Sequence, residues 1–489
     1  MGGDSELKRQ TAKTLKWNAI DRVSSQVLYA LTGIVLANIL SKEDFGLVGA
    51  LLVFQAFGIL FVDSGFGSAL LQKKQPTQRD YSTVFWFNLG VSLLVYAILW
   101  LGAPLIADIF QGDQRLIPMS RVMFLTFVLN GTALVQTTRL MKEMNVKMVA
   151  MANVIGLTLS GGIGIWLALS GAGAWALVWQ SVTLSAVKSG WLWITGGWRP
   201  RRVFSIESMK SIWRVGLSVF SSSALNTFFL YIYSFVIGAF YNLTALGVYT
   251  QADKWSKMGS ASISQVLTAT FVPLLSRVQD DRESFNRYVK RINRFSAFII
   301  FPVMLGGAAV GTPLFHTLFG TKWDAAVPLF QILMARGALI VLISVYNNYL
   351  LALGYARKIF TVELVKDGMI ALAVLATVWH GTVEALVWGQ LTASAATWAI
   401  VLAIVCHSTG YSASKMGGDL LPFLIAGGIC AGGAWAVSLL GLPSVVTLIV
   451  GVIAGAGIYV GIAAAFRLPE LQEAADYLRV RIGKKGITT

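Results

Sequence analysis

Long apolar runs follow one another along most of this 489-residue chain, and they restrict what it can fold into. A helix needs about 20 residues to cross the roughly 30 Å of hydrocarbon in a bilayer. With 56% hydrophobic and only 13% charged residues, the chain is too apolar for an ordinary water-soluble domain. We therefore predict an all-α integral membrane protein with about fourteen transmembrane helices, at residues 15–40, 45–72, 81–103, 117–137, 147–169, 174–195, 211–240, 245–275, 294–318, 326–352, 359–379, 383–407, 419–440 and 445–466.

The Lys and Arg residues are distributed unevenly between alternate connections. One set is basic and comprises residues 73–79, 139–147, 199–210, 277–294, 357–358, 415 and the tail from 467. The other set carries little beyond Lys42, Arg115 and Lys322. By the positive-inside rule, this pattern predicts an even number of spans with both termini in the cytoplasm. The basic residues lie between apolar runs and form no continuous face, so we expect no nucleic-acid partner.

Two halves of the chain repeat a pattern of motifs. Gly102-Ala103-Pro104-Leu105 matches Gly311-Thr312-Pro313-Leu314, and Ala176-Leu177-Val178-Trp179 matches Ala385-Leu386-Val387-Trp388. A repeat of six spans keeps its orientation in the membrane, which predicts two lobes related by a pseudo-two-fold axis along the membrane normal. The predicted divisions are residues 1–205 with spans 1 to 6, residues 206–410 with spans 7 to 12, and residues 411–489 with two further spans and a basic cytoplasmic tail.

Several cations lie within the predicted spans, where a charge is costly unless it faces a partner or a wet cavity. Counting about 1.5 Å per residue places Lys254, Lys257 and Arg336 near mid-membrane. Arg22 lies less deep, and Arg214 has the corresponding place in the second half. Guanidinium and ammonium groups bind phosphate. These five cations are therefore our candidates for binding a phosphate-bearing substrate.

The same residues also have structural interpretations. Arg22 can pair with Asp63, and Lys257 can pair with Asp253 one helical turn away. Arg214 can be an interfacial side chain whose charge reaches the membrane surface.

The carboxylates offer a further alternative. Asp63 or Asp253 can bind a coupling cation or proton, so Na⁺, H⁺ and the membrane potential are the candidate energy sources. For Glu363, Lys366 and Asp367 we favour structural pairing. We expect no cofactor and no metal site, because His316, His380 and His407 lack metal-ligand spacing.

The first 85 residues carry a series of linked motifs: Trp17, Asp21-Arg22, Ser25-Gln26, residues 40–46, residues 63–74 and residues 80–85. Taken in this order, they resemble the start of Wzx-type polysaccharide flippases of the multidrug/oligosaccharidyl-lipid/polysaccharide exporter superfamily. The resemblance implies a V-shaped transporter with a cationic central cavity and no enzymatic activity. Its substrate would be an undecaprenyl-diphosphate-linked oligosaccharide, moved to the periplasmic leaflet by alternating access for exopolysaccharide, capsule or lipopolysaccharide export. Membrane lipids, the polysaccharide polymerase and the export machinery are the candidate partners.

Three other functions compete with this interpretation. A lipid II flippase would have a similar cationic cavity. A cation-coupled drug exporter of the same superfamily would be expected to have a cavity dominated by carboxylates. A membrane polysaccharide polymerase or ligase would normally need a large periplasmic loop, whereas the longest predicted periplasmic connection here runs only from Pro104 to Leu116.

Overall fold

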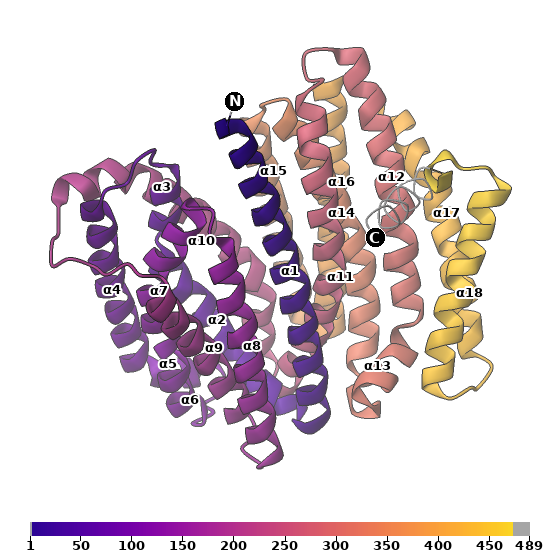
Figure 1. The fold of residues 1–489 in the computed structure, drawn as a ribbon. Coiled ribbons are helices and arrows are strands. Elements are labelled where there is room, and N and C mark those ends of the chain that lie inside the picture. Colours follow the sequence, from indigo (N-terminus) through magenta and orange to yellow (C-terminus); the bar gives the residue numbers. More distant parts are fainter. Residues whose placement is uncertain (1, 473–489) are drawn as a thin grey trace, which may run out of the picture. The chain divides into compact units, whose positions relative to one another are not determined.

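The computed structural model describes residues 2–472, and every regular element in that range is helical (Figure 1). The chain divides into two compact units, Met1–Thr250 and Gln251–Thr489. The predicted basic tail residues Arg479, Arg481, Lys484 and Lys485 lie outside the described residues. The first unit contains α1 (Gly2–Ile39), α2 (Lys42–Asp63), α3 (Phe66–Gln72), α4 (Gln78–Leu101), α5 (Ala103–Ile109), α6 (Leu116–Met123), α7 (Leu125–Lys142), α8 (Val146–Leu169), α9 (Trp175–Thr195) and α10 (Ile206–Phe240).

The helix α11 (Leu243–Ser276) begins in the first unit and continues into the second. The second unit also contains two short 3₁₀ turns, Thr321–Trp323 and Val378–His380. Its remaining helices are α12 (Arg282–Ala309), α13 (Gly311–Phe319), α14 (Ala326–Ala352), α15 (Ala356–Thr377), α16 (Val383–Thr409), α17 (Ala413–Ser438) and α18 (Ser444–Ala465).

Side-chain caps decide where two helices of the first unit begin. The Ser41 hydroxyl accepts from the Asp44 backbone N–H at 3.1 Å, while the Asp44 carboxylate accepts from the Ser41 N–H at 2.8 Å. Thr77 and Asp80 form the same reciprocal cap at the start of α4. Each arrangement satisfies backbone donors that the first helical turn leaves open. Most of the polar segment 41–44, which separates the first two predicted spans, is therefore the first turn of α2.

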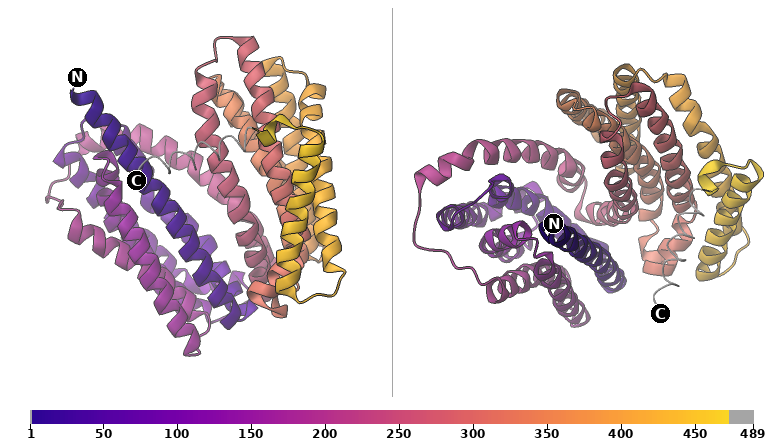
Figure 2. Two further views of the ribbon diagram at one scale, coloured as in Figure 1. Left: turned by 45° about the vertical axis from the view of Figure 1, so that its right-hand side comes forward. Right: turned by 45° about the horizontal axis from the view of Figure 1, so that its top comes forward.

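Packing within the first unit places α8 between α1 and α9, as Figures 1 and 2 show. The long helix α10 bends along the side of this unit and packs against α2 and α3 (Figure 2). Small residues allow the close approaches, because a Cβ at Gly161 would lie only 2.4 Å from Thr32 Cγ2.

Packing within the second unit pairs α12 with α17, α17 with α18, and α14 with α16. Polar side chains join α11 to α14: Ser264 and Ser344 hydroxyls lie 2.8 Å apart, and Asn348 Nδ2 donates to Thr268 Oγ1 at 3.0 Å. The paired positions rise together along both helices, so α11 and α14 run parallel.

The structure confirms an all-α membrane protein. Among the described residues, eleven helical segments are long and apolar enough to cross a bilayer. Three further helices, α1, α9 and α15, coincide with the other predicted spans and have 38, 21 and 22 residues. The total of fourteen spans and the pseudo-two-fold axis stay predictions.

Three predicted spans contain a break in the helix. The run 45–72 breaks where Ser64 and Gly65 adopt φ values of 47° and 68°, in the left-handed region. The run 117–137 breaks at Phe124, whose carbonyl accepts from the Phe127 N–H at 3.0 Å, three residues on. The run 294–318 breaks at Val310, and beyond it Pro313 has no N–H to donate to the Ala309 carbonyl.

The two copies of the Gly-x-Pro motif form the same local structure. Each follows the end of a long helix and begins a short one, α5 or α13, and each short helix leads to a buried phenylalanine, Phe110 or Phe319. The contacts group α10 with the first six spans, although span counting assigns it to the second lobe. The division at residue 205 stays a prediction about the repeat.

Candidate functional site

Asp21 is the centre of a polar cluster in the first unit. On α1 its carboxylate accepts two hydrogen bonds from Asn153 Nδ2 of α8, both 3.1 Å long, and one from the Ser25 hydroxyl at 3.3 Å. Lys188 of α9 is close enough to Asp21 to interact with it electrostatically. Three helices thus share one half-buried polar and electrostatic contact.

The predicted residues Arg22, Asp63 and Arg214 all belong to the first unit, but the structure pairs none of them. Arg22 and Arg214 are exposed and Asp63 is half-buried. Among the described residues, no side-chain ion pair or hydrogen bond involves any of these three. The suggested pairing of Arg22 with Asp63 is therefore absent from the described contacts.

Asp63 ends α2 at the break between α2 and α3. A Cβ at Gly67 would lie 3.2 Å from Asp63 Oδ1 and 3.3 Å from Thr138 Oγ1, so a side chain there would crowd the carboxylate. Gly65 packs against α10, where its Cβ would lie 2.3 Å from the Gly216 carbonyl oxygen. The glycines of the Asp-Ser-Gly-Phe-Gly motif thus allow the break and the close approach of α10.

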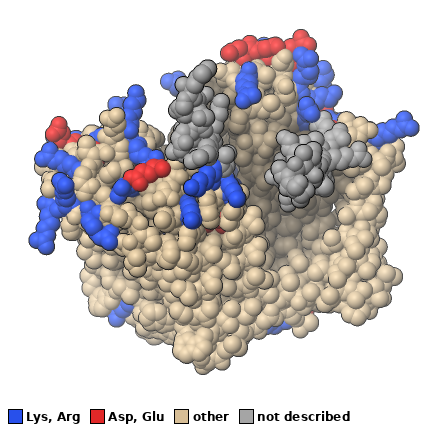
Figure 3. All heavy atoms as spheres, viewed as in Figure 1, with Lys and Arg blue, Asp and Glu red and all other residues tan. Residues whose placement is uncertain are grey.

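The short helix α3 is anchored at its end by two lysines. Lys142 of α7 donates to the carbonyls of Leu70, Leu71 and Lys73, which a helix end leaves without partners. Lys73 pairs with the buried carboxylate of Asp80 at 2.9 Å. In Figure 3, Lys and Arg side chains gather toward the upper part of the face shown.

Asp253, Lys254 and Lys257 lie together on α11 in the second unit. Lys257 Nζ is 2.6 Å from Asp253 Oδ2, so the structural alternative of a pair one turn apart is present. The Lys254 ammonium lies over the ring of Trp255, 5.4 Å from its centroid. Trp255 in turn packs against Phe319, with ring centroids 5.1 Å apart.

Arg336 lies on the neighbouring helix α14. Its Nε donates to the Ser394 hydroxyl of α16 at 3.2 Å. The next residue, Gly337, packs against α11, since its Cβ would lie 3.3 Å from Ser260 Cβ. Lys257 is one turn before Ser260, so the structure brings Lys257 and Arg336 to adjacent helices at a similar level. We call Asp253, Lys254, Lys257 and Arg336 the α11 and α14 cluster; among the described residues of these two helices it contains three cations and the Asp253 carboxylate.

The charges on α15 pair with one another, as predicted. Lys366 forms an ion pair with Glu363, and its Nζ lies 3.8 Å from Asp367 Oδ1.

A second ionic cluster lies in the first unit, outside the spans. Arg115 bonds to both oxygens of Asp113 and pairs with Glu43. The hydrogen bonds from Arg115 hold the pKa of the Asp113 carboxyl below its usual value. The same contacts raise the pKa of Arg115. The cluster fastens the start of α2 to the connection between α5 and α6.

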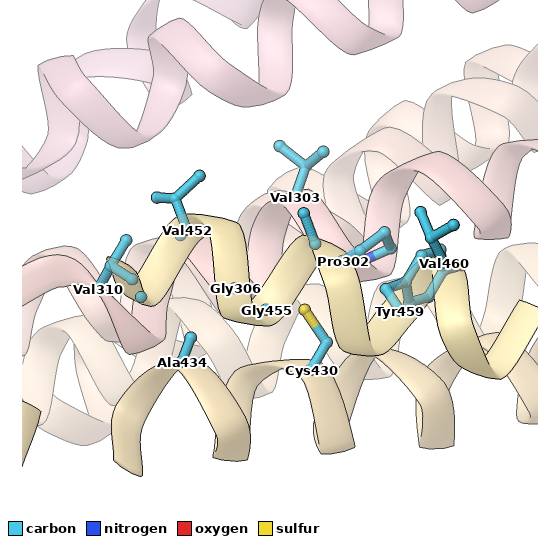
Figure 4. Close-up of a pocket in the computed structure, with 13 residues that line it drawn as sticks. Pro302, Val303, Gly306, Val310, Cys430, Ala434, Val452, Gly455, Tyr459 and Val460 are labelled. Atoms are coloured by element: carbon cyan, nitrogen blue, oxygen red, sulfur yellow. The ribbon is translucent and has the colours of Figure 1, made fainter. Parts of the chain in front are cut away.

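An apolar pocket of about 380 Å³ lies in the second unit between α12, α17 and α18 (Figure 4). Val303, Val310, Val452 and Val460 surround it, with glycines on α12 and α18. The Tyr459 hydroxyl donates to the Phe298 carbonyl at 2.9 Å and so is satisfied within the protein. The lining suits a hydrocarbon chain rather than a polar ligand.

Residues 35–328 match the sequence model of a family described as polysaccharide biosynthesis proteins. The match spans more than half of the chain. The chain belongs to this family.

Curated relatives agree with this membership. The teichuronic acid biosynthesis protein TuaB of Bacillus subtilis is 25% identical over 86% of this chain and 87% of its own length. The succinoglycan biosynthesis transport protein ExoT of Rhizobium meliloti is 24% identical over 85% of this chain and 82% of its own length. The lipopolysaccharide biosynthesis protein WzxC of Escherichia coli is 24% identical, with 68% of each chain covered.

Solved structures of two transporters share the fold of this family member. The lipid II flippase MurJ, in an inward closed conformation, has a TM-score of 0.74 at 13% identity and covers 92% of this chain and 98% of its own. An inward-facing multidrug resistance transporter of the MATE family has a TM-score of 0.59 at 17% identity, with 79% and 96% covered. At such identities the likeness shows the fold.

Lys188 and Asn153 were missed by sequence reasoning. Lys188 is a single lysine inside the run 174–195, and that position alone marks it as a candidate. Asn153 carries no charge, and its role depends on packing between α1 and α8 that no local pattern indicates.

Proposed function

We propose that this protein is a flippase that moves an undecaprenyl-diphosphate-linked oligosaccharide from the cytoplasmic to the periplasmic leaflet of a bacterial inner membrane. The family match over residues 35–328 carries the proposal. A relative named for succinoglycan transport and another named for lipopolysaccharide biosynthesis support it. Alternating access and cytoplasmic termini are part of the same proposal. The uneven distribution of Lys and Arg between alternate connections supports this topology.

The proposed substrate-binding residues are Arg22, Arg214, Lys254, Lys257 and Arg336. The α11 and α14 cluster supports this role most directly, because Arg336 donates to the neutral Ser394 hydroxyl and has no carboxylate partner among the described residues. A diphosphate would supply the missing negative charge and can accept bidentate hydrogen bonds from a guanidinium group.

Of the two candidate coupling carboxylates, we favour Asp63. Asp253 is already paired with Lys257 at 2.6 Å, whereas Asp63 has no ion pair among the described residues. An unpaired carboxylate within a span can take up a proton or a cation such as Na⁺.

The alternatives differ in the charge they require. A drug exporter that binds cations would need carboxylates where α11 and α14 present lysines and an arginine. Lipid II carries the same diphosphate chemistry, so the sugar that the protein accepts must separate these two functions by experiment. We also favour transport over a polymerase or ligase, because none of the relatives reported above is named as a polymerase or ligase.

Alanine substitution of Lys254, Lys257 and Arg336 tests the proposed site. The triple variant should abolish polysaccharide export in a strain that lacks the wild-type protein, while its abundance in the membrane stays unchanged. A matched triple at exposed positions of the second unit, Arg277, Arg287 and Lys290 to alanine, removes the same charge and should retain export. Full export by the first triple would exclude the α11 and α14 cluster as a substrate site.

A further inference from the structure

The connection between α9 and α10 in the first unit is held by side chains of two other helices. Gln136 of α7 donates to the Trp198 carbonyl at 2.8 Å, and Gln78 of α4 donates to the Arg199 carbonyl at 2.8 Å. Trp86 Nε1 donates to the Arg201 carbonyl, also at 2.8 Å. Each hydrogen bond fixes one backbone group of the connection.

Two α4 hydroxyls complete this attachment. Ser82 Oγ accepts from the Arg201 N–H at 3.0 Å, and Thr83 Oγ1 accepts from the Ser205 N–H at 3.1 Å. Ser82 and Thr83 are buried, as is Gln136. Membrane orientation requires only that this connection be basic, and it does not require buried polar side chains that fix its backbone. These hydrogen bonds therefore fix the backbone positions of Arg199 and Arg201.

A polar pocket of about 510 Å³ lies where this connection meets α4 and α7. Trp198 and Tyr81 are its buried aromatic residues, with ring centroids 6.2 Å apart. The pocket is lined by Gln78, Tyr81, Arg139, Gly197, Trp198, Arg199 and Arg201.

The three arginines of this pocket outnumber the nearby carboxylates. Arg139 uses Nε to bind Glu143 at 2.7 Å, and Arg199 donates through Nη1 to the Trp198 carbonyl at 2.9 Å. Among the described residues, the guanidinium of Arg201 makes no hydrogen bond or ion pair. Two carboxylates lie near the pocket, Glu143 and Asp80, and Asp80 is already paired with Lys73. The remaining excess of guanidinium groups favours an anion, and phosphate suits their planar donor geometry.

Exposed apolar side chains next to the pocket indicate which phosphate it receives. Ile194, Phe204 and Ile206 are 80%, 53% and 66% exposed, and they flank the arginines along the chain. The helices α4 and α10, both long and apolar enough to span a bilayer, begin beside them. Apolar and basic side chains combined at the end of spans are typical of a membrane surface.

We propose that the pocket formed by Arg139, Arg199 and Arg201 binds the phosphate headgroup of an anionic phospholipid. This inference does not depend on the transported substrate and requires only that α4 and α10 cross the membrane. The bound lipid would fasten the start of α10 to α4 and α7, because its phosphate bridges the fixed connection and α7.

Native mass spectrometry of the purified full-length protein in detergent tests the proposal, with phosphatidylglycerol added as the anionic lipid. The wild type should retain phosphatidylglycerol in preference to phosphatidylethanolamine. R201Q should weaken phosphatidylglycerol binding about fivefold, the effect of losing one basic residue at a membrane surface. R201K keeps the charge without the fork of donors, and its affinity should lie between those of the wild type and R201Q.

R202Q is the matched control, since it removes the same charge from the neighbouring residue, which does not line the pocket. It should bind the lipid as the wild type does. An equal loss of lipid affinity in R201Q and R202Q would show that diffuse surface charge, and not the pocket, binds the lipid. Inorganic phosphate should stabilise the protein much less than the lipid at the same concentration. Equal stabilisation by both would overturn the assignment to a lipid headgroup. Unchanged phosphatidylethanolamine binding in R201Q shows that the variant is folded.

Discussion

At the scale of single residues, Asp21 illustrates how a carboxylate is accommodated inside an apolar helix. It receives hydrogen bonds from Asn153 and Ser25 and lies near the ammonium of Lys188. A buried charge that loses its partner costs more than the pair contributes, because the remaining ion is still desolvated. The cluster therefore makes α1, α8 and α9 depend on one another.

A double-mutant cycle measures this dependence. D21N and K188M should each lower the melting temperature of the purified protein, because each leaves one charge without its partner. The double variant D21N/K188M should be more stable than the sum of the two losses predicts, with a coupling of about 0.5–3 kcal/mol. Strictly additive losses would contradict an interaction between the two side chains.

Asp113 gives a prediction that depends on pH. Hydrogen bonds from Arg115 lower the pKa of its carboxyl in the folded protein, whereas the pKa of Asp in an unfolded chain is about 3.9. A lowered folded pKa means that the stabilisation is complete above the unfolded pKa and is lost as the pH falls through the folded pKa.

The melting temperature of the wild type should therefore exceed that of D113N by a constant amount from pH 7 to about pH 5. The difference should shrink as the pH falls below about 4. Thermal unfolding of both proteins across this range checks the expectation, and a difference independent of pH would contradict it.

At the scale of elements, breaks divide some of the long apolar runs into two shorter helices. The break between α2 and α3 leaves Asp63 at a helix end, and the two lysines Lys73 and Lys142 hold the short helix that follows. Two features explain why glycine is required at position 65: its left-handed φ value, and its contact with Gly216 of α10, which leaves no room for a side chain.

Gly65→Ala should destabilise the first unit. The left-handed conformation costs an alanine roughly 1–2 kcal/mol, and the clash with the Gly216 carbonyl adds to this cost. Gly90→Ala is the control within α4, where no atom lies within 4 Å of the added Cβ. Thermal unfolding should show a clear loss of stability for Gly65→Ala. It should show none for Gly90→Ala, because alanine has a higher helix propensity than glycine. Equal stability of both variants would show that position 65 tolerates a side chain.

At the scale of the whole molecule, hydropathy predicted the class of the fold and the positions of the long helices well. Each depends only on the length and composition of one segment, which the sequence shows directly. The breaks were not predictable in this way, because Ser64 and Gly65 leave the helical region to fit the contact between Gly65 and Gly216. The position of Lys188 inside an apolar run could have marked it as a candidate, but its interaction with Asp21 on a distant helix is not visible in the sequence.

The candidate site was predictable as residue types but not as contacts. A charge inside an apolar run identified Lys254, Lys257 and Arg336, while the contacts of Arg336 with Ser394 and of Gly337 with Ser260 depend on helix packing. The Lys257–Asp253 pair was predictable because both residues lie on one helix. The pairing of Arg22 with Asp63 required contact between two helices, and the structure does not contain it.

The leaflet location of the lipid-linked oligosaccharide tests the central claim most directly. In a strain deleted for this protein, the oligosaccharide should accumulate in the cytoplasmic leaflet and the surface polysaccharide should disappear. Expression of this chain should restore both the periplasmic location and the polymer. A normal leaflet distribution and normal polysaccharide in the deleted strain, together with altered sensitivity to cationic drugs, would contradict the flippase account and indicate a drug exporter.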